Sequence, residues 1–258
     1  MTAGPHHKLL TGRSALITGA SSGIGAAAAR IFCREGAAVT LVARREKQLA
    51  DLTDELRAQG HQAQYVVADV THTEQIAHAV NKAITTYGHL DTAFNNAGTG
   101  ATPQPMHLLD ENAYDTVMDT NVRGTWNSMR HEIRAMLTHG KGTIVNNSST
   151  AGLVATPVTA TYIASKHAVL GLTKAAACEY ATHNIRINAI APGTTRTEMI
   201  NNWLTNNPTI EQTLLNSSPL PRMAHPNEIA EAAAFLSSDR ASYILGTTLT
   251  IDGGWTTQ

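Results

Sequence analysis

Short apolar segments alternate with longer amphipathic segments along most of this chain of 258 residues. Such alternation is typical of βαβ units, whose strands run parallel and whose helices cover both faces of one sheet. We therefore predict an α/β fold with a doubly wound parallel sheet of about seven strands. The strands are expected at residues 14–18, 38–43, 64–68, 92–95, 142–147, 186–190 and 248–251.

Helical patterns fill the segments between these strands. Leucines at spacings of three and four predict a helix over residues 46–59, and similar patterns predict helices over 73–87 and 111–138. No linker or repeat divides the chain, so we expect one domain over residues 1–258 with an N-terminal tail at 1–11. Asparagines and prolines interrupt residues 197–225, which predicts a small lid over a site.

The composition favours small-molecule chemistry. Lysine and arginine total 19 against 20 acidic residues, so no overall charge attracts the chain to nucleic acid or to an anionic membrane. No apolar run of 18 residues and no apolar N-terminal leader occurs, so we expect a soluble cytoplasmic protein. The 12 histidines are scattered, and His6 and His7, the one adjacent pair, lack further ligands nearby. We therefore expect no metal site.

Three glycines lie between the first expected strand and the helix that follows it. A turn without Cβ atoms lets the backbone approach a pyrophosphate, and the amides at a helix N-terminus attract its negative charge. The spacing differs from the common dinucleotide pattern, but its place after the first strand strengthens the prediction. The expected cofactor-binding residues of this turn are Gly19, Ser21, Ser22, Gly23, Ile24 and Gly25.

Two arginines follow the second expected strand. Arg44 lies 19 residues after Gly25, where an acidic residue would bind the 2′-hydroxyl of NAD. A guanidinium at this point can instead bind a 2′-phosphate with charge-assisted hydrogen bonds. We therefore predict NADP(H), bound by Arg44 and Arg45. NAD(H) is the alternative if both arginines simply begin the next helix in solvent.

Tyr162 and Lys166 are four residues apart, so a helix places both side chains on one face. An ammonium group close to a phenol favours the phenolate and lowers the phenol pKa from its usual value of about 10. Such a tyrosine can pass a proton to or from an alcohol or ketone oxygen near neutral pH. The spacing alone is common in helices, so the prediction depends on the other motifs.

Four further motifs follow the glycine turn in order: Asn95-Asn96-Ala97-Gly98, Asn121, Ser148-Ser149 and Pro192-Gly193. Together with Tyr162-x-x-x-Lys166 they resemble the single-domain branch of the short-chain dehydrogenase/reductase family, over roughly residues 11–256. The resemblance implies a Rossmann-type fold and hydride transfer between a nicotinamide cofactor and a carbonyl or alcohol substrate. It also implies a homo-oligomer, a tetramer or dimer, formed through helices near residues 111–138 and 161–182.

The resemblance assigns roles to individual residues. It makes Tyr162 the general acid/base, and it makes Lys166 a ligand of the nicotinamide ribose as well as the partner of Tyr162. Ser149 precedes Tyr162 by thirteen residues and would orient the substrate oxygen, with Ser148 as the alternative. The backbone of Asn121 would hold a water in a proton relay that reaches Lys166. The implied cofactor contacts are Asp69 and Val70 at the adenine, the backbone of Asn95, Ala97 and Gly98 along the adenosine, and Pro192, Gly193, Thr195 and Thr197 at the nicotinamide.

Two residues depart from the family pattern: Asn147, where an apolar residue is more usual, and Arg196 within the nicotinamide loop. The predicted function is an NADP(H)-dependent reductase of a fairly apolar carbonyl compound. The alternatives are an NAD-dependent secondary-alcohol dehydrogenase, a 3-oxoacyl carrier-protein reductase and, more remotely, a non-catalytic dinucleotide-binding protein. The apolar pocket is predicted from Met199, Trp203, Leu204, Leu214 and Leu215 in the lid, with Leu153 and Val154.

Overall fold

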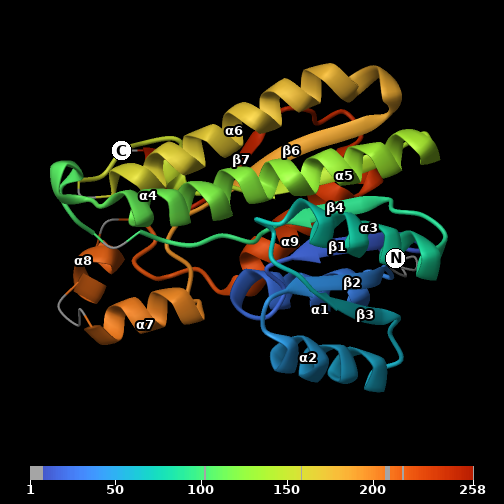
Figure 1. Ribbon diagram of the computed structural model, residues 1–258. Coiled ribbons are helices and arrows are strands. Elements are labelled where there is room, and N and C mark those ends of the chain that lie inside the picture. Colours follow the sequence, from blue (N-terminus) through green and yellow to red (C-terminus); the bar gives the residue numbers. More distant parts are fainter. Residues whose placement is uncertain (1–7, 102, 158, 207–209, 217, 258) are drawn as a thin grey trace, which may run out of the picture.

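The computed structural model describes residues 8–101, 103–157, 159–206, 210–216 and 218–257. In this part of the chain, parallel strands form one seven-stranded sheet in the order β3-β2-β1-β4-β5-β6-β7 (Figure 1). The strand order reverses between β1 and β4. At such a switch point the connections leave the sheet on opposite sides, which opens a crevice beyond the carboxyl ends of the strands.

The structure confirms the predicted Rossmann-type α/β fold. The strands are β1 (Ser14–Thr18), β2 (Ala38–Ala43), β3 (Ala63–Val67), β4 (Thr92–Asn95), β5 (Gly142–Asn147), β6 (Ile185–Pro192) and β7 (Thr248–Ile251). The helices are α1 (Gly23–Arg34), α2 (Glu46–Ala58), α3 (Thr73–Tyr87), α4 (Glu111–Met118), α5 (Gly124–His139), α6 (Ala160–Tyr180), α7 (Glu198–Asn206), α8 (Ile210–Asn216) and α9 (Pro226–Ser237).

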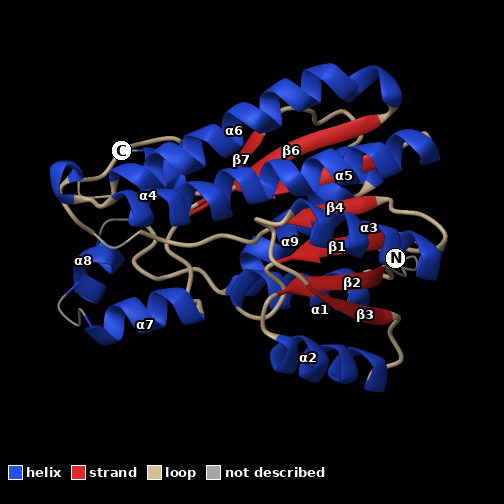
Figure 2. Ribbon diagram, viewed as in Figure 1, coloured by secondary structure: helices blue, strands red, loops and turns tan. Residues whose placement is uncertain are grey.

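Two helix layers cover the sheet (Figure 2). Ala15 and Ile17 of β1 belong to the core that contains residues of α1, α2 and α9. Leu16, whose side chain points to the other face, belongs to the core that contains residues of α3, α5 and α6. Because β1 is buried on both faces, its sequence is nearly continuous in small and apolar residues rather than alternating.

Some predicted boundaries need correction. The third strand begins one residue earlier than predicted, and the sixth extends through Pro192. The expected helix over 111–138 is interrupted, because a π turn (Asp119–Arg123) separates α4 from α5. The predicted tail is wrong at Leu10, which is fully buried and whose amide donates to the Glu35 carbonyl. Residues 1–7 lie outside the described part.

Helices α7 and α8 lie within the segment predicted as a lid, and Figure 1 shows them apart from the two helix layers. Residues 207–209 and 217, and the side chains of Trp203 and Leu214, lie outside the described part. Leu204 is buried, but Met199 is half exposed. The unexplained Arg196 forms an ion pair with Glu211 of α8 at 3.0 Å, so it ties the nicotinamide loop to this segment.

None of the helices in the described part of the chain combines the length and apolar character that a membrane span requires.

Candidate active site

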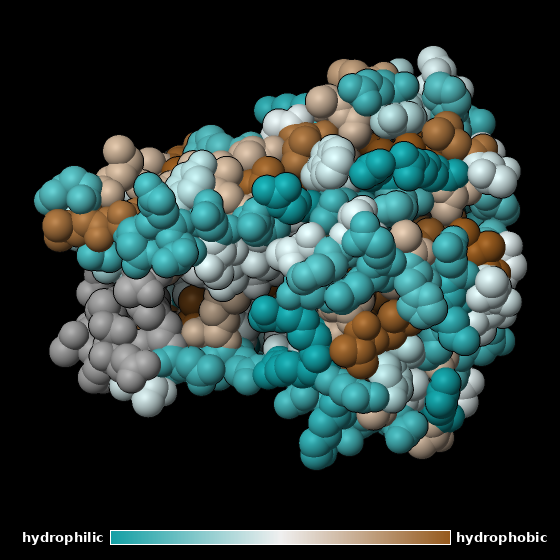
Figure 3. Space-filling view, in the orientation of Figure 1, coloured by the Kyte–Doolittle hydropathy of each residue, from teal (hydrophilic) through white to brown (hydrophobic). Residues whose placement is uncertain are grey.

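A cavity of about 720 Å³ opens at the carboxyl edge of the sheet. Its volume falls within the usual range for small-molecule sites, about 300–1,000 Å³. The space-filling view shows a hollow between the α7–α8 segment and the body of the molecule (Figure 3). The predicted residues that line the cavity are Gly19, Ser21, Ser22, Gly23, Ile24, Arg44, Arg45, Asp69, Val70, Ala97, Gly98, Ser149, Tyr162, Lys166, Pro192, Gly193, Thr195 and Thr197.

Gly25, Asn95 and Asn121 were also predicted to bind cofactor or to act in catalysis, but they do not line the cavity. Gly25 lies behind the turn, where a Cβ atom would collide with the Gly19 carbonyl. The Asn95 side chain points into the core and donates to Glu132 and Asn146. The Asn95 side chain therefore supports the sheet beneath the cavity, and the predicted contact of its backbone with the cofactor stays a prediction.

The glycine turn leaves the first turn of α1 open to a ligand. Ser22 is the N-cap, and its side chain makes no capping hydrogen bond, so it leaves the amides of this turn to an anion. Gly19 has a φ of +65°, and a Cβ atom there would lie 2.8 Å from the Ala97 Cα. Only glycine therefore fits at this position.

Arg45 lies across the same turn. Its guanidinium donates to the Ser21 and Ser22 hydroxyls at 3.2 and 2.7 Å, and it forms an ion pair with Glu198 of α7 at 2.9 Å. The arginine thus joins the turn to the first residue of the α7–α8 segment. A phosphate bound at this turn would meet a cation already in place.

Three residues outside the predicted set hold the turn against β4 and β5. The Thr18 hydroxyl accepts from the Asn96 and Ala97 amides at 3.0 and 3.1 Å. The Asn96 side chain donates to the Gly19 carbonyl at 3.2 Å and accepts from Asn147 at 2.8 Å. This network explains why Asn147 departs from the family pattern, since an apolar residue would leave Asn96 without that donor.

Tyr162, Ser149 and Lys166 meet at the inner end of the cavity, where Lys166 is 5% exposed. The Ser149 hydroxyl hydrogen-bonds the Tyr162 phenol. The Ser148 hydroxyl points elsewhere and donates to the Lys166 carbonyl at 2.9 Å. Of the two adjacent serines, Ser149 is therefore the one whose hydroxyl reaches the tyrosine.

The predicted effect of Lys166 on Tyr162 needs correction. Burial raises the pKa of the phenol, and the hydrogen bond from Ser149 opposes this rise. The Lys166 ammonium lies 5.6 Å from the centroid of the tyrosine ring and donates to the Asn147 carbonyl at 3.0 Å. Burial lowers the pKa of Lys166 to about 8. A partly neutral lysine over the ring face lowers the phenol pKa less than a full charge beside the hydroxyl.

Asn121 occupies the π turn between α4 and α5. Its side chain accepts from the Thr99 amide at 2.8 Å and donates to the Thr99 carbonyl and the Ser165 hydroxyl, both at 3.0 Å. The backbone carbonyl of Asn121, which was expected to hold a water, accepts from the Thr125 hydroxyl at 2.7 Å.

Asp69 and Arg44 mark the far end of the cavity. The Asp69 carboxylate accepts from the amide and hydroxyl of Thr71, both at 2.9 Å, and its other oxygen lies 3.8 Å from Arg44. Burial by itself would raise the pKa of Asp69, but the hydrogen bonds from Thr71 and the charge of Arg44 bring it below its usual value. The Arg44 side chain is 75% exposed, so it is free to turn toward a ligand.

A second cavity of about 390 Å³ lies on the other side of Tyr162. Both cavities share Thr150, Thr159, Tyr162, Thr194 and Ile200. The apolar part of the second cavity is formed by Ile200, Leu220, Ile251 and Trp255. Leu153 and Val154, which were expected to line an apolar pocket, are 39% and 38% exposed and line neither cavity.

The donor set fits a dinucleotide: open amides at a helix N-terminus, arginines at one end of a long cavity, and a buried ammonium beside a tyrosine at the other. Open amides at a helix N-terminus bind a pyrophosphate. A buried ammonium beside a tyrosine suits a nicotinamide ribose that lies next to a reacting carbonyl. The fold and this site define a nicotinamide-dependent oxidoreductase.

Comparisons with known proteins agree with this class. The family model described as enoyl-(acyl carrier protein) reductase matches residues 19–256. The chain belongs to the short-chain dehydrogenase/reductase family, whose members bind nicotinamide dinucleotides and act on CH–OH or C=O groups.

Individual relatives cover nearly the whole chain. An A-factor type γ-butyrolactone 1′-reductase (1S-forming) of Streptomyces virginiae is 60% identical over 249 residues, which cover 96% of this chain and 97% of the relative. Among solved structures, a short-chain type dehydrogenase/reductase from Mycobacterium marinum has a TM-score of 0.92 at 34% identity, with 98% of each chain covered. A gluconate 5-dehydrogenase from Burkholderia cenocepacia, in complex with NADP and tartrate, has a TM-score of 0.92 at 33% identity, again with 98% of each chain covered.

Proposed function

We propose that this protein is an NADP(H)-dependent reductase of a ketone, and that its substrate is a γ-butyrolactone carrying a ketone at the 1′ position. The observation that carries the proposal is the position of Tyr162, whose hydroxyl is hydrogen-bonded by Ser149 and which lies between a long cavity and a smaller, partly apolar one. The long cavity suits the cofactor, and the smaller one suits a substrate.

Each residue at the inner end of the cavity has its own role in the proposed reaction. NADPH supplies the hydride when it is bound. Ser149 and Tyr162 both donate to the ketone oxygen, so charge that develops there during reduction is stabilised. Tyr162 then gives its proton to that oxygen, which leaves an alcohol. Lys166 binds the ribose hydroxyls and returns a proton to Tyr162. Asn121 keeps the loop at Thr99 next to α6 while this happens.

The preference for NADP(H) is supported by the cations at the adenine end. Arg44 and Arg45 line the cavity, whereas the first acidic side chain there, Asp69, is hydrogen-bonded to Thr71. A carboxylate is needed to accept from a 2′-hydroxyl, and guanidinium groups are needed to bind a 2′-phosphate. The NADP complex of the Burkholderia cenocepacia relative is consistent with this proposal.

The substrate proposal combines the second cavity with the name of the Streptomyces virginiae relative. A lactone ring with an acyl chain has a polar head and an apolar tail. With its ketone at Tyr162, the head would lie near Thr150 and Thr159, and the tail would reach the wall formed by Ile200, Leu220, Ile251 and Trp255. A cavity of about 390 Å³ holds a molecule of this size.

The test is a comparison of substrates at matched concentrations, followed by the absorbance of NADPH. We expect a 2-acyl-γ-butyrolactone with a 1′-ketone to be reduced faster than a 3-oxoacyl thioester, and NADH to replace NADPH poorly. A higher catalytic efficiency with the thioester would support the carrier-protein reductase instead. Faster oxidation of a secondary alcohol with NAD would support the dehydrogenase and contradict the proposal.

We also propose that the chain forms one domain with residues 197–225 as its lid, and that it assembles with copies of itself. Tyr114 of α4 and Trp126 of α5 are large side chains that remain 49% and 47% exposed. Exposed aromatic residues on adjacent helices are typical of an interface between subunits. Light scattering of the purified protein tests this proposal, and the cytoplasmic location remains a prediction.

A further inference from the structure

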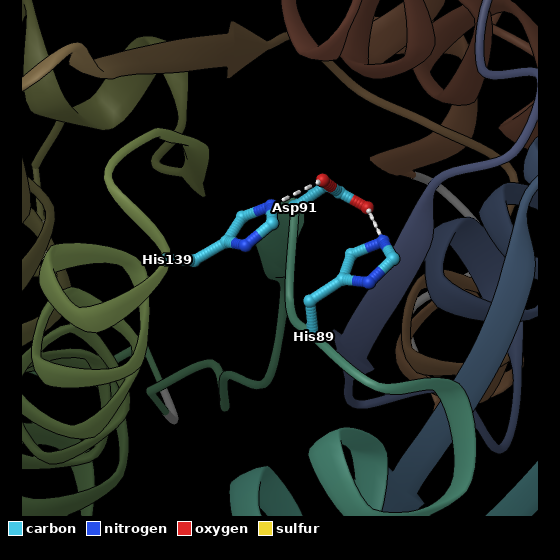
Figure 4. Close-up of side chains that lie close together, drawn as sticks. All are labelled: His89, Asp91 and His139. Carbon is cyan, nitrogen blue, oxygen red and sulfur yellow. Dashed lines mark ion pairs between the residues drawn. The ribbon is translucent and has the colours of Figure 1, made fainter.

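Two histidines and an aspartate converge in the structure (Figure 4). They lie at the amino ends of the parallel strands, whereas the candidate active site lies at the carboxyl ends. His89 and Asp91 lie in the loop that leads into β4, and His139 is the last residue of α5. The Nε2 atom of His89 is 2.7 Å from one carboxylate oxygen of Asp91, and the Nε2 atom of His139 is 3.4 Å from the other. The sequence pattern does not indicate this cluster, because 50 residues separate its two histidines.

We infer that His89, Asp91 and His139 form a binding site for a divalent transition metal ion such as Zn²⁺. The ligand atoms of the three residues all lie within 4.8 Å of one another. A tetrahedral zinc ion with bonds of about 2.0–2.1 Å holds its ligand atoms roughly 3.3 Å apart. A rotation that turns the planes of the two imidazoles toward a common point would bring this cluster to the geometry of three protein ligands with one position left for water.

The carboxylate is held in place by the fold. Asp91 is 6% exposed, and one of its oxygens accepts from the Ser14 amide at 2.8 Å. The Asp91 backbone pairs with Ser14 and Thr143, so it is fixed between the starts of β1 and β5. A hydrogen bond from a backbone amide orients a metal-binding carboxylate in the way that outer partners do in known metal sites.

The two imidazoles are partly exposed, and one of them lies at a helix C-terminus. Their side chains are 33% and 31% exposed, so an ion can reach the Nε2 atoms from solvent. The rings stack at a centroid distance of 4.8 Å with an interplanar angle of 10°, so at least one ring must turn out of the stack before both in-plane Nε2 lone pairs can reach one ion. His139 also ends α5, where the partial negative charge of the helix C-terminus favours a cation.

The ligand chemistry selects the class of metal. Imidazole nitrogen suits zinc, nickel, copper and cobalt, whereas magnesium and calcium prefer oxygen ligands. The ion would join the loop before β4 to the end of α5. Because this edge is remote from Tyr162, we expect the ion to stabilise the fold rather than to take part in hydride transfer.

The test measures zinc binding by the full chain after treatment with a chelator. We expect one equivalent of Zn²⁺ to bind at pH 7.5 and to raise the melting temperature, with no comparable effect of Mg²⁺. His89→Gln and His139→Gln should each weaken zinc binding by roughly tenfold or more, since each removes one ligand. Asp91 is left unchanged because it also holds the Ser14 amide.

Two control variants separate this site from other histidines. His183→Gln changes an exposed histidine near the start of β6, and the double variant His6→Gln, His7→Gln removes the adjacent pair. Both should bind zinc as the unaltered protein does. Cobalt substitution should give the intense visible absorption of a tetrahedral ion, and His139→Gln should abolish it. The inference is overturned if the unaltered chain binds no equivalent of zinc, or if both single variants retain its affinity.

Discussion

At the residue scale, Tyr162 and Lys166 share one face of α6 but have different environments. Tyr162 is hydrogen-bonded by Ser149 and its pKa is raised by burial, whereas burial lowers the pKa of Lys166 to about 8. The protonated phenol therefore predominates at neutral pH, as a proton donor for ketone reduction requires. A lysine that titrates near neutral pH can pass a proton to the phenol.

We expect Tyr162→Phe to lower the turnover number for ketone reduction by about 10²–10⁴-fold, because it removes the proton donor and keeps the ring. The dissociation constant of NADPH, measured by fluorescence titration, should change little. In the unaltered protein, reduction should slow and alcohol oxidation should accelerate as the pH rises through about 8, since Lys166 then loses the proton that it would return to the phenol. Turnover of the phenylalanine variant at the original rate would contradict the role of Tyr162.

Arg44 and the choice of cofactor give a second prediction at this scale. Arg44→Asp should lower catalytic efficiency with NADPH by roughly 10- to 100-fold, because a charge-assisted hydrogen bond is lost and a repulsion is added. The catalytic efficiency with NADH should stay the same or increase. Arg134→Asp is a matched control, since it makes the same charge change on an exposed part of α5. Equal losses with both cofactors would show that Arg44 does not recognise the 2′-phosphate.

At the element scale, the π turn between α4 and α5 brings a polar residue to the base of the site. Asn121 is 1% exposed and bonds both to Thr99 and to Ser165 of α6. The sequence predicted a continuous helix over 111–138, because the apolar periodicity on each side is helical. A periodicity cannot reveal the one extra residue of a π turn, which depends on partners far away in the chain.

Asn121→Ala should reduce the free energy of unfolding by about 2–4 kcal/mol, because Thr99 and Ser165 lose their partners in a buried place. Urea unfolding measures this change, and Asn112→Ala on the exposed side of α4 should have almost no effect. Cofactor affinity should fall as well, since the loop at Gly98 and Thr99 lines the cavity. An Asn121→Ala variant with unchanged stability and unchanged cofactor affinity would contradict this structural role.

Sequence patterns were sufficient to predict most of the strands. Apolar runs bounded by turn residues predicted β1, β2, β4, β5 and β7 with the observed bounds. The site was harder to predict, because motifs name positions but not the direction of side chains. Asn95 and Asn96 are adjacent, yet Asn95 points into the core, while Asn96 bonds to Gly19. Thr18 has no recognisable motif of its own, and Asn147 was noted only as a departure from the family pattern, because the partners of both residues lie far away in the chain.

At the scale of the whole molecule, the stability should depend on a buried carboxyl group between α5 and the sheet. Glu132 is fully buried and accepts from Asn95 at 2.9 Å, while its other oxygen has no hydrogen-bond partner among the described residues. Burial raises the pKa of Glu132 to about 8. The folded protein therefore keeps a proton that the unfolded chain releases at a pH of about 4.3.

Because the folded state holds that extra proton, the free energy of unfolding should fall as the pH rises from about 5 to 8. Glu132→Gln, which resembles the protonated carboxyl, should remove this part of the pH dependence and be more stable than the unaltered protein at pH 8. Glu179→Gln changes an exposed carboxylate on α6 and should leave the pH dependence as it was. Parallel stability curves for the unaltered chain and Glu132→Gln would show that the carboxyl is not protonated in the fold.

The proposed reaction is hydride transfer from NADPH to a ketone that is held by Tyr162 and Ser149. The most direct measurement uses NADPH with both C4 hydrogens replaced by deuterium and a 2-acyl-γ-butyrolactone, followed by mass spectrometry of the product. We predict one deuterium on the new carbinol carbon, almost none with Tyr162→Phe in the same time, and a single configuration at that carbon. An alcohol without deuterium, or no alcohol at all while NADPH binds normally, would contradict the central claim.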